Sequence, residues 1–520
     1  MDNFNTFIQT HFKISLIFFG IGLIFGLFYS INLLGFSINS QTLLPTNLRA
    51  LHISLMLYGF VPLMLSYLPF LLIKKEVGSS KKGLHYLNLY TIFWYIFLIF
   101  MISSLLFGNT RGLAFYDFPY ELNFILAFAG IFYIIALYNF IKMYKVHPMW
   151  VKVCLRVVII APIALLILMN PIIGQVESTV SGPHGDNTLG MSLALIPLYY
   201  LIIKLLNKEE FIARWNLLWI IPTVFYFSSV LYRIFFEPLT YNQEWFLEYL
   251  SLLYVPLLYR WYKDSNIEHF AKLSLFISIF AFLFVDIEGN ILFIPEIRWI
   301  FHRNDLIVAH AHIAMGIAVF FMVLCMFTSY INELKKTAFY YLYLLGLLGI
   351  FFSLSFSGFV EAGILNSNIK LLWILRSCFG LITLSSLLFF IQSKYTLSTL
   401  QKYNLIGVLS DGLGGIGLIL LSSFIYPLLG FTFAGSYEYI VFTFVSMTGI
   451  IHFMALKYKE HQIILTNITV IIRVFISSVF FALYISKTLG FIGLIISAFD
   501  LTFVLVYLIF FYQKDILCKN

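Results

Sequence analysis

Apolar runs long enough to cross a membrane recur along the whole chain. Each run has roughly 20 residues, the length of a helix that spans a hydrocarbon core of about 30 Å, and short polar loops separate successive runs. Lipid offers no hydrogen-bond partner to the backbone, and the runs are too long and continuous for barrel strands, so each is expected to be a helix. The sequence therefore predicts an all-α, polytopic transmembrane bundle of about sixteen helices.

The composition agrees with a membrane protein and excludes other classes. Of the 520 residues, 61% are hydrophobic and only 11% are charged. The net charge of +8 comes from Lys and Arg residues in the loops, so membrane lipid is an expected partner and nucleic acid is not. The four cysteines show no CxxC spacing, so neither a disulfide framework nor a zinc site is expected.

The distribution of basic residues predicts the orientation in the membrane. The loops after the even-numbered predicted helices carry most of the lysines, and the intervening loops, such as GNTRGLAFYDFPYE, are poorer in lysine. Basic loops stay on the cytoplasmic side, so both termini are expected there. We expect a multi-pass protein of the cell inner (cytoplasmic) membrane.

The chain divides into a main membrane unit and a smaller C-terminal segment. No loop is long enough to form a soluble domain, so residues 1–395 are expected to form a core of twelve helices. Residues 400–520 are expected to add about four transmembrane helices of unassigned role. Within this added segment a few polar residues interrupt the apolar runs: Asp411, Glu438, His452, Arg473 and Asp500.

Three histidines lie at similar depth in two predicted helices of the core. His52 is about one turn into the span 48–73, and His310 and His312 are six to eight residues into the span 304–331, with both spans starting on the outer side. Residues two apart on a helix point about 200° apart, so His310 and His312 cannot easily bind one metal together. They suit two planar haem groups, one on each side of the helix, with His52 as second axial ligand to one of them.

These histidines lie in segments that resemble a known family. FHRNDLIVAHAHIAMGIAVFF resembles the tenth helix of subunit I of the haem-copper oxidases, whose VAHxH motif ligates both haems, and LRALHISLMLYGF is similar to the second-helix ligand region. FVDIEGNILFIPEIRWIFH, FFSLSFSGFVEAGI and LLWILRSCFG resemble helices nine, eleven and twelve of the branch that holds the b-haem C-type cytochrome c oxidases and the nitric oxide reductases. The resemblance covers roughly residues 13–392.

The resemblance implies two b-type haems and a set of residues that serve them. His52 and His312 would bind a low-spin haem, and His310 would be the proximal ligand of a high-spin haem. The resemblance also makes Glu288 a candidate proton-path or metal-bridging carboxylate, against a plain interfacial acid. Three arginines near the outer helix ends are candidate partners of the haem propionates, against plain outer-loop cations: Arg49, Arg298 and Arg303.

The chain departs from the family at the position of the copper site. The stretch SGPHGDNTLGMS places Asp186 on the expected ligand position and His184 two residues earlier, and IIPTVFYFSSVLYRIFFEP has no histidine where a pair is expected. Tyr232 and Arg233 stand there instead, so a copper centre with three imidazoles is not expected. Asp186, His184 and Glu237 are candidates for another metal, and Tyr232 for the tyrosine that oxidases use.

Three functions remain open at the level of sequence. The first is an oxidoreductase of the respiratory chain, similar to cytochrome c oxidase or nitric oxide reductase, that works with further oxidase subunits and an outer electron donor such as a cytochrome c. The second is a dihaem electron-transfer, sensor or assembly protein that has lost the copper site and catalysis. The third is a transporter or structural membrane protein without haem, whose histidines are only intramembrane polar residues.

Overall fold

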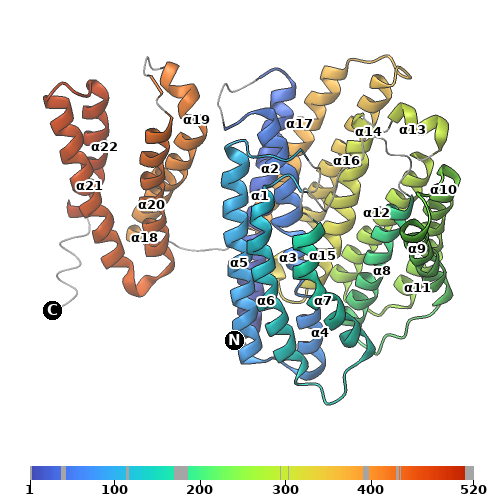
Figure 1. Cartoon of the computed structure of the whole chain (residues 1–520). Helices are drawn as coiled ribbons and strands as arrows, with labels where there is room; N and C mark the ends of the chain where they lie inside the picture. The colour runs from blue at the N-terminus through green and yellow to red at the C-terminus, as the bar shows by residue number, and fades with distance from the viewer. Residues whose placement is uncertain are drawn as a thin grey trace. The chain divides into compact units, whose positions relative to one another are not determined.

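The computed structural model describes residues 3–36, 42–112, 116–168, 185–292, 294–301, 304–390, 398–428, 432–433 and 435–509 (Figure 1). All regular secondary structure in these ranges is helical. Eleven helices among the described residues are long and apolar enough to cross a membrane, and three shorter apolar helices accompany them. This confirms the prediction of an all-α, polytopic bundle.

By internal contacts the chain divides into two compact units. The first comprises Met1–Ser37 with Pro45–Gln392, and the second Ile38–Leu44 with Ser393–Asn520. The first unit holds seventeen of the described α-helices: α1 (Asn3–Leu33), α2 (Pro45–Tyr58), α3 (Val61–Leu65), α4 (Leu68–Val77), α5 (Lys81–Leu106), α6 (Asn123–Ile141), α7 (Met149–Leu168), α8 (Gly185–Leu206), α9 (Leu217–Phe235), α10 (Tyr241–Leu250), α11 (Tyr254–Asp264), α12 (His269–Leu292), α13 (Pro295–Phe301), α14 (Asp305–Ala311), α15 (Phe320–Phe327), α16 (Thr337–Glu361) and α17 (Ile369–Ser386).

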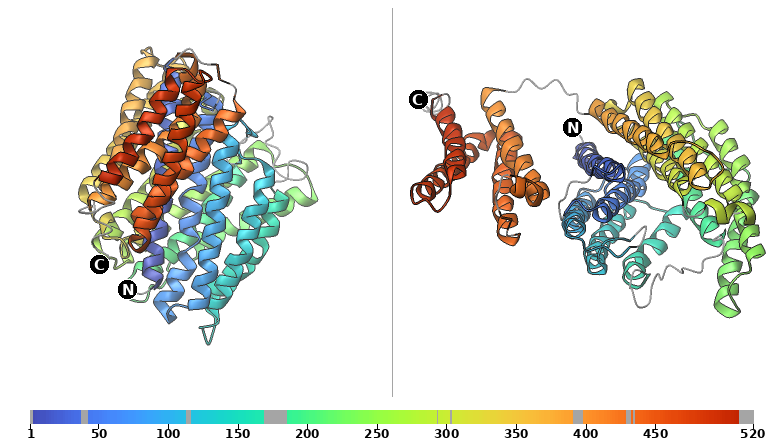
Figure 2. Two further views of the ribbon diagram at one scale, coloured as in Figure 1. Left: turned by 90° about the vertical axis from the view of Figure 1, so that its left-hand side faces the viewer. Right: turned by 90° about the horizontal axis from the view of Figure 1, so that it is seen from above.

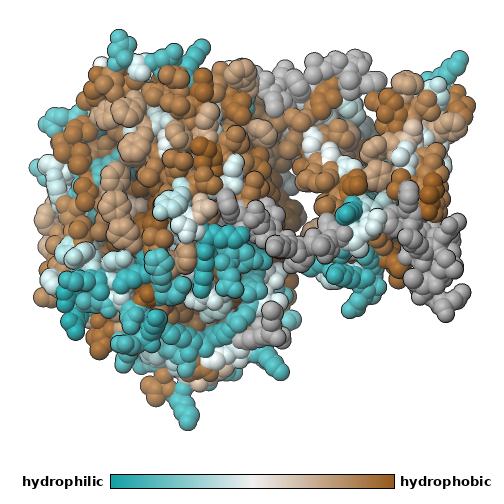
Figure 3. Space-filling view, turned by 180° about the vertical axis from the view of Figure 1, so that it is seen from behind, coloured by the Kyte–Doolittle hydropathy of each residue, from teal (hydrophilic) through white to brown (hydrophobic). Residues whose placement is uncertain are grey.

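The surface of the first unit has the character of a membrane protein. On the face seen in Figure 3, apolar side chains cover the middle of this unit and hydrophilic ones gather at its lower end. Large apolar side chains such as Phe100, Ile159 and Phe280 are more than half exposed. Exposed apolar surface of this extent is stable only against lipid or a partner.

The predicted span 48–73 is broken into three helices. α2, α3 and α4 follow one another with Pro62 and Pro69 in the first turns of α3 and α4. Proline has no backbone N–H and its ring clashes with the carbonyl four residues earlier, so a helix ends just before it. The three pieces still make one apolar span, Pro45–Val77.

The stretch Tyr241–Asp264 is also not a single helix. α10 and α11 are joined by a 3-10 turn, η2 (Ser251–Leu253), and each is too short to cross a membrane alone. The Ser251 hydroxyl donates to the carbonyl of Glu248, 2.7 Å away, at this break. The acid next to this break, Glu248, is fully buried inside the first unit.

The predicted helix 304–331 contains a π-helical stretch. Its first turn is capped by the Asn304 side chain, which accepts from the backbone N–H of Leu306 at 3.0 Å. α14 then continues into a π-helix, η3 (His312–Val319), before α15. π-helical turns are rare and occur often at functional sites, and here the turn begins at one of the predicted haem ligands.

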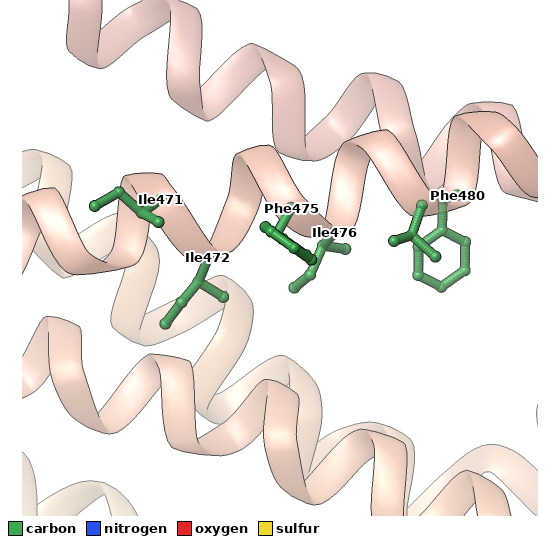
Figure 4. Close-up of a pocket in the computed structure, with 6 residues that line it drawn as sticks. Ile471, Ile472, Phe475, Ile476 and Phe480 are labelled. Atoms are coloured by element: carbon green, nitrogen blue, oxygen red, sulfur yellow. The ribbon is translucent and has the colours of Figure 1, made fainter.

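The second unit is a bundle of its own. It comprises α18 (Thr399–Gly407), a π-helical turn η6 (Val408–Leu413), α19 (Gly414–Leu428), α20 (Ser436–Lys457), α21 (Gln462–Ile485) and α22 (Phe491–Tyr507). α20 packs against α18, η6, α19 and α21, and α21 pairs with α22 (Figure 2). The outer face of α21 carries a shallow groove with only apolar lining, which includes Ile471 and Phe475 (Figure 4).

Candidate functional site

His52 on α2 and His312 at the start of η3 lie next to each other in the first unit. Their ring centroids are 6.2 Å apart and their planes differ by 26°. His52 Nδ1 lies 2.9 Å from the Gly22 carbonyl, and His312 Nδ1 lies 2.7 Å from the Val308 carbonyl. A carbonyl oxygen only accepts, so each Nδ1 carries the hydrogen and, in the neutral ring, each Nε2 has a free lone pair.

The spacing of the two rings fits two axial ligands of one metal ion. A bond between a metal and an imidazole nitrogen is about 2 Å long, so imidazoles on opposite sides of one ion have ring centres roughly 6 Å apart. Both rings are only half-buried, which leaves room beside them. The spacing of the ring centres and the free Nε2 lone pairs therefore fit two residues that would hold a haem iron.

The close approach of α1 to α2 holds His52 in place. A Cβ on Gly26 would lie 2.5 Å from His52 Nδ1, and a Cβ on Gly22 would lie 2.5 Å from the terminal methyl of Met56. Only glycine allows this contact. The carbonyl of Gly22 can thus reach the imidazole and fix its tautomer.

His310 is oriented by a carboxylate from another helix. Its Nδ1 lies 3.2 Å from Glu288 Oε2, which joins α14 to α12. The carboxylate accepts, so Nδ1 donates and, in the neutral ring, Nε2 keeps a lone pair that could bind a metal. A second partner of this kind fixes the ring of a metal-binding histidine and raises its basicity. Two residues that the sequence singled out are therefore in contact.

Two buried acids lie near His310 that the sequence analysis did not single out. A Cβ on Gly289 would lie 3.4 Å from Glu248 Oε1 and 3.7 Å from His310 Cε1. Both side chains therefore lie close to the backbone of Gly289, which has no side chain of its own. Asp286 is 5% exposed and accepts from the Ser192 hydroxyl at 3.4 Å. An acid inside a mostly apolar stretch is the signal that would have found both.

The buried acids belong to a wider polar cluster. Asn290 Nδ2 lies 3.3 Å from the Ser251 hydroxyl and 2.8 Å from the carbonyl of Asp286. Asp286 Oδ2 and the hydroxyl of Tyr254 are buried without a hydrogen-bond partner among the described residues. Unpaired buried polar atoms are costly unless water or a ligand reaches them. The cluster therefore keeps polar atoms that could bind protons or water.

The predicted propionate partners have different surroundings. Arg298 is 4% exposed, and its guanidinium lies 4.9 Å from the ring centre of Trp299. Arg49 is exposed near the start of α2, and Arg303 lies outside the described residues. Of the two that the structure describes, Arg298 is the buried one.

Arg376 on α17 is a further intramembrane cation. Its Nε donates to the Ser30 hydroxyl at 2.9 Å. The lone arginine within the apolar stretch LLWILRSCFG is the signal that could have identified it. Nearby on α17, Trp373 Nε1 donates to Asp305 Oδ2 at 2.9 Å, at the start of the helix that carries His310.

The residues predicted at the position of the copper site are not joined to His310 by any described contact. The Tyr232 hydroxyl donates to Glu237 Oε1 at 3.3 Å, and its ring stacks on Phe236 at the exposed end of α9. His184 lies outside the described residues, and Asp186 is the second residue of α8, with its side chain not described. Among the described side chains, no three His, Cys, Asp or Glu residues converge to hold a metal ion.

Comparison with known proteins identifies the first unit. Residues 7–382 match the family described as Cytochrome C and Quinol oxidase polypeptide I. This stretch includes His52, His310 and His312 and most of the helices of the first unit. No curated protein matches the chain. The family match covers well over half of the sequence, and the chain therefore belongs to the cytochrome c and quinol oxidase polypeptide I family.

Proposed function

We propose that the chain is the haem-binding catalytic subunit of a respiratory membrane oxidoreductase that reduces a small gas, oxygen or nitric oxide. The observation that carries this proposal is the state of the three histidines, each with Nδ1 bound to an acceptor and Nε2 left for a metal. His52 and His312 would hold a low-spin haem and His310 a high-spin haem, both b-type. The haems would supply one-electron redox chemistry and a binding site for the gas.

The acids near His310 would supply protons. Reduction of oxygen or nitric oxide consumes protons, so the reaction needs groups that hold them close to the gas. Glu288 contacts His310, and Glu248 lies beside Gly289, to which His310 is also close. Asp286 continues the cluster toward Ser192 on α8. We therefore assign proton delivery to Glu248, Asp286 and Glu288.

Nitric oxide is the second candidate substrate, and one observation favours it over oxygen. α9 has no histidine, and its Tyr232 donates to Glu237. α9 therefore offers no imidazole where the resemblance expects a pair of copper ligands, and its tyrosine already has a carboxylate partner, which supports nitric oxide. A dihaem electron-transfer, sensor or assembly role is the alternative if turnover with both gases is absent.

The proposed setting is the inner membrane, with further oxidase subunits and an outer electron donor such as a cytochrome c. Loops predicted to be cytoplasmic gather at one end of the first unit, as ion pairs between them indicate. Lys204 lies 3.3 Å from Glu76, and Lys335 lies 3.7 Å from Glu268. Basic loops at one end support an orientation with both termini inside.

Optical and metal analysis of the purified full chain tests the proposal. We expect two b-type haems per chain, one of which binds carbon monoxide in the reduced state, and turnover of oxygen or nitric oxide. His52→Ala should remove the low-spin signal alone, and His310→Ala the signal that responds to carbon monoxide. His461→Ala, at an exposed position, is the matched control.

Each other outcome points to a different function. Two haems without turnover would support the electron-transfer, sensor or assembly role. A colourless protein from haem-replete cells would overturn the proposal and leave a transporter or structural protein.

A further inference from the structure

The second unit buries a cluster of charged side chains among apolar helices. Arg473 on α21 is 1% exposed and donates to two carboxylates, with Nη2 at 2.6 Å from Asp411 Oδ2 and Nη1 on Asp500 Oδ1. Its guanidinium also lies 3.8 Å from the ring centre of Phe503. Ile471 and Phe475 on the same helix, which line the apolar groove of Figure 4, are instead well exposed, so α21 buries its one charged residue and exposes apolar ones.

A buried histidine with one unused nitrogen completes the cluster. His452 on α20 is fully buried, and its Nδ1 lies 2.8 Å from Asn404 Oδ1. The Asn404 amide nitrogen donates to the Leu400 carbonyl at 3.0 Å, which fixes the amide so that its oxygen faces the imidazole. His452 Nδ1 is therefore the donor. Nε2 has no hydrogen-bond partner among the described residues and lies 3.8 Å from Asp411 Oδ2.

The charges in this cluster balance only if it binds a proton. One guanidinium faces two carboxylates, so the cluster carries one net negative charge while His452 is neutral. An uncompensated charge in a low-dielectric interior is expensive. A proton at His452 Nε2, or on the Asp411 carboxyl that faces it, makes the cluster neutral.

The helices around the cluster hold these side chains rigidly. Asp411 lies on the π-helical turn η6, a geometry that occurs often at functional sites. A Cβ on Gly407 would lie 2.4 Å from the His452 ring, and a Cβ on Gly449 would lie 2.1 Å from the backbone nitrogen of Gly412. Both approaches exist only because glycine stands at these positions.

Among the described residues, the other titratable groups near the cluster each have a partner of their own: Tyr403, Tyr507 and Asp500. Tyr403 on α18 lies 6.0 Å from the His452 ring between centroids, and its hydroxyl donates to the Phe503 carbonyl. α19 has no charged residue, and its Tyr426 packs against Phe433 and Phe442. Arg473 and Asp500 are the other two charged groups of the cluster, and they form an ion pair with each other.

We propose that His452 Nε2 and Asp411 share one exchangeable proton, which makes the second unit a proton-binding site within the membrane. The proposal does not rest on the proposed haem chemistry, because all four ionisable residues lie beyond residue 382 in the sequence, where the family match ends. A purified protein without haem would therefore not contradict the proposed proton-binding site.

Infrared difference spectroscopy of the full chain in lipid vesicles, between acidic and alkaline buffers, tests the proposal. The wild type should show a protonation that is lost in His452→Gln and kept in His461→Gln, a change at an exposed histidine. The proposal is overturned if wild type and His452→Gln give the same difference spectrum, because the cluster would then be a fixed ion pair.

Asp500→Asn provides a second arm that does not depend on the folding of the histidine variant. Without the Asp500 charge, Arg473 and Asp411 balance each other while His452 is neutral. The demand for a proton is then weaker, and the midpoint of the protonation should move to lower pH by about one unit or more. An unchanged midpoint would contradict the proposed site.

Discussion

The hydrogen bonds at Nδ1 decide which nitrogen of each histidine can act. Gly22, Val308 and Glu288 each offer an acceptor to one of the three histidines of the first unit, and Asn404 does the same for His452. In every case Nε2 is left over. In the first unit this nitrogen suits a metal, and in the second unit the adjacent carboxylate suits it to a proton.

Gly26→Ala tests how tightly His52 is positioned. The new methyl group would lie 2.5 Å from His52 Nδ1, so the ring must move away from the Gly22 carbonyl. We expect the low-spin haem signal to fall by at least about half, with a loss of roughly 1–3 kcal/mol of stability from overpacking. Gly20→Ala is the control, because its methyl would meet Leu387 at an ordinary 3.6 Å. An unchanged spectrum of Gly26→Ala would argue against His52 as a ligand.

Glu288→Gln tests the carboxylate behind His310. Glutamine keeps the shape and an acceptor oxygen but removes the negative charge that orients the imidazole and raises its basicity. We expect the haem count to stay the same while turnover falls about 10- to 100-fold. Glu296→Gln, at an exposed position, should leave turnover unchanged. Equal turnover in wild type and Glu288→Gln would contradict this role and support the alternative, in which Glu288 is a plain interfacial acid.

At the scale of elements, the sequence predicts helices well and their interruptions poorly. Hydropathy places the apolar spans, because a run of apolar residues in lipid has to be a helix. The breaks at Pro62 and Pro69 follow from proline chemistry and were within reach of the sequence. The π-helix that begins at His312 and the one that contains Asp411 could not be predicted from the sequence. A π-helix has one more residue per hydrogen-bonded turn than an α-helix, and no residue pattern marks that extra residue.

The candidate site was predictable in part for the same reason. Depth along a helix follows from counting residues, and this placed His52 beside His312 at one level. Glu248 lies near His310 because the helix is interrupted by the 3-10 turn that begins at Ser251 and because Gly289, which lies beside both side chains, has no side chain. Tertiary packing decides such contacts, and the local sequence does not contain them.

Gly449→Ala tests the packing of elements in the second unit. A methyl group there would lie 2.1 Å from the backbone nitrogen of Gly412, which cannot move without shifting η6. We expect a loss of about 3 kcal/mol or more, read as a lower unfolding temperature and faster proteolysis within residues 398–509. Gly417→Ala meets nothing within 4 Å and should stabilise α19 by up to about 1 kcal/mol. Similar melting of the two variants would contradict the close packing of η6 on α20.

At the scale of the whole molecule, the two units carry different sets of ionisable residues. The family match ends at residue 382, and the three histidines with all of their Nδ1 partners lie before that point. The ionisable cluster around Arg473 lies wholly after it. The first unit is therefore sufficient for the proposed haem ligands, and the second adds a site that the family match does not cover.

A chain that ends after residue 392 tests this division. We expect it to insert in the membrane and to keep the haem content and spectrum of the full chain, because no proposed ligand is removed. A shorter chain that ends after residue 327 is the contrasting control. It lacks α16, whose Gly358 packs directly on the Leu306 backbone at the start of α14, so the helix that carries His310 loses its support. Loss of haem from the longer truncation, with the protein still inserted, would show that the second unit contributes to the haem site.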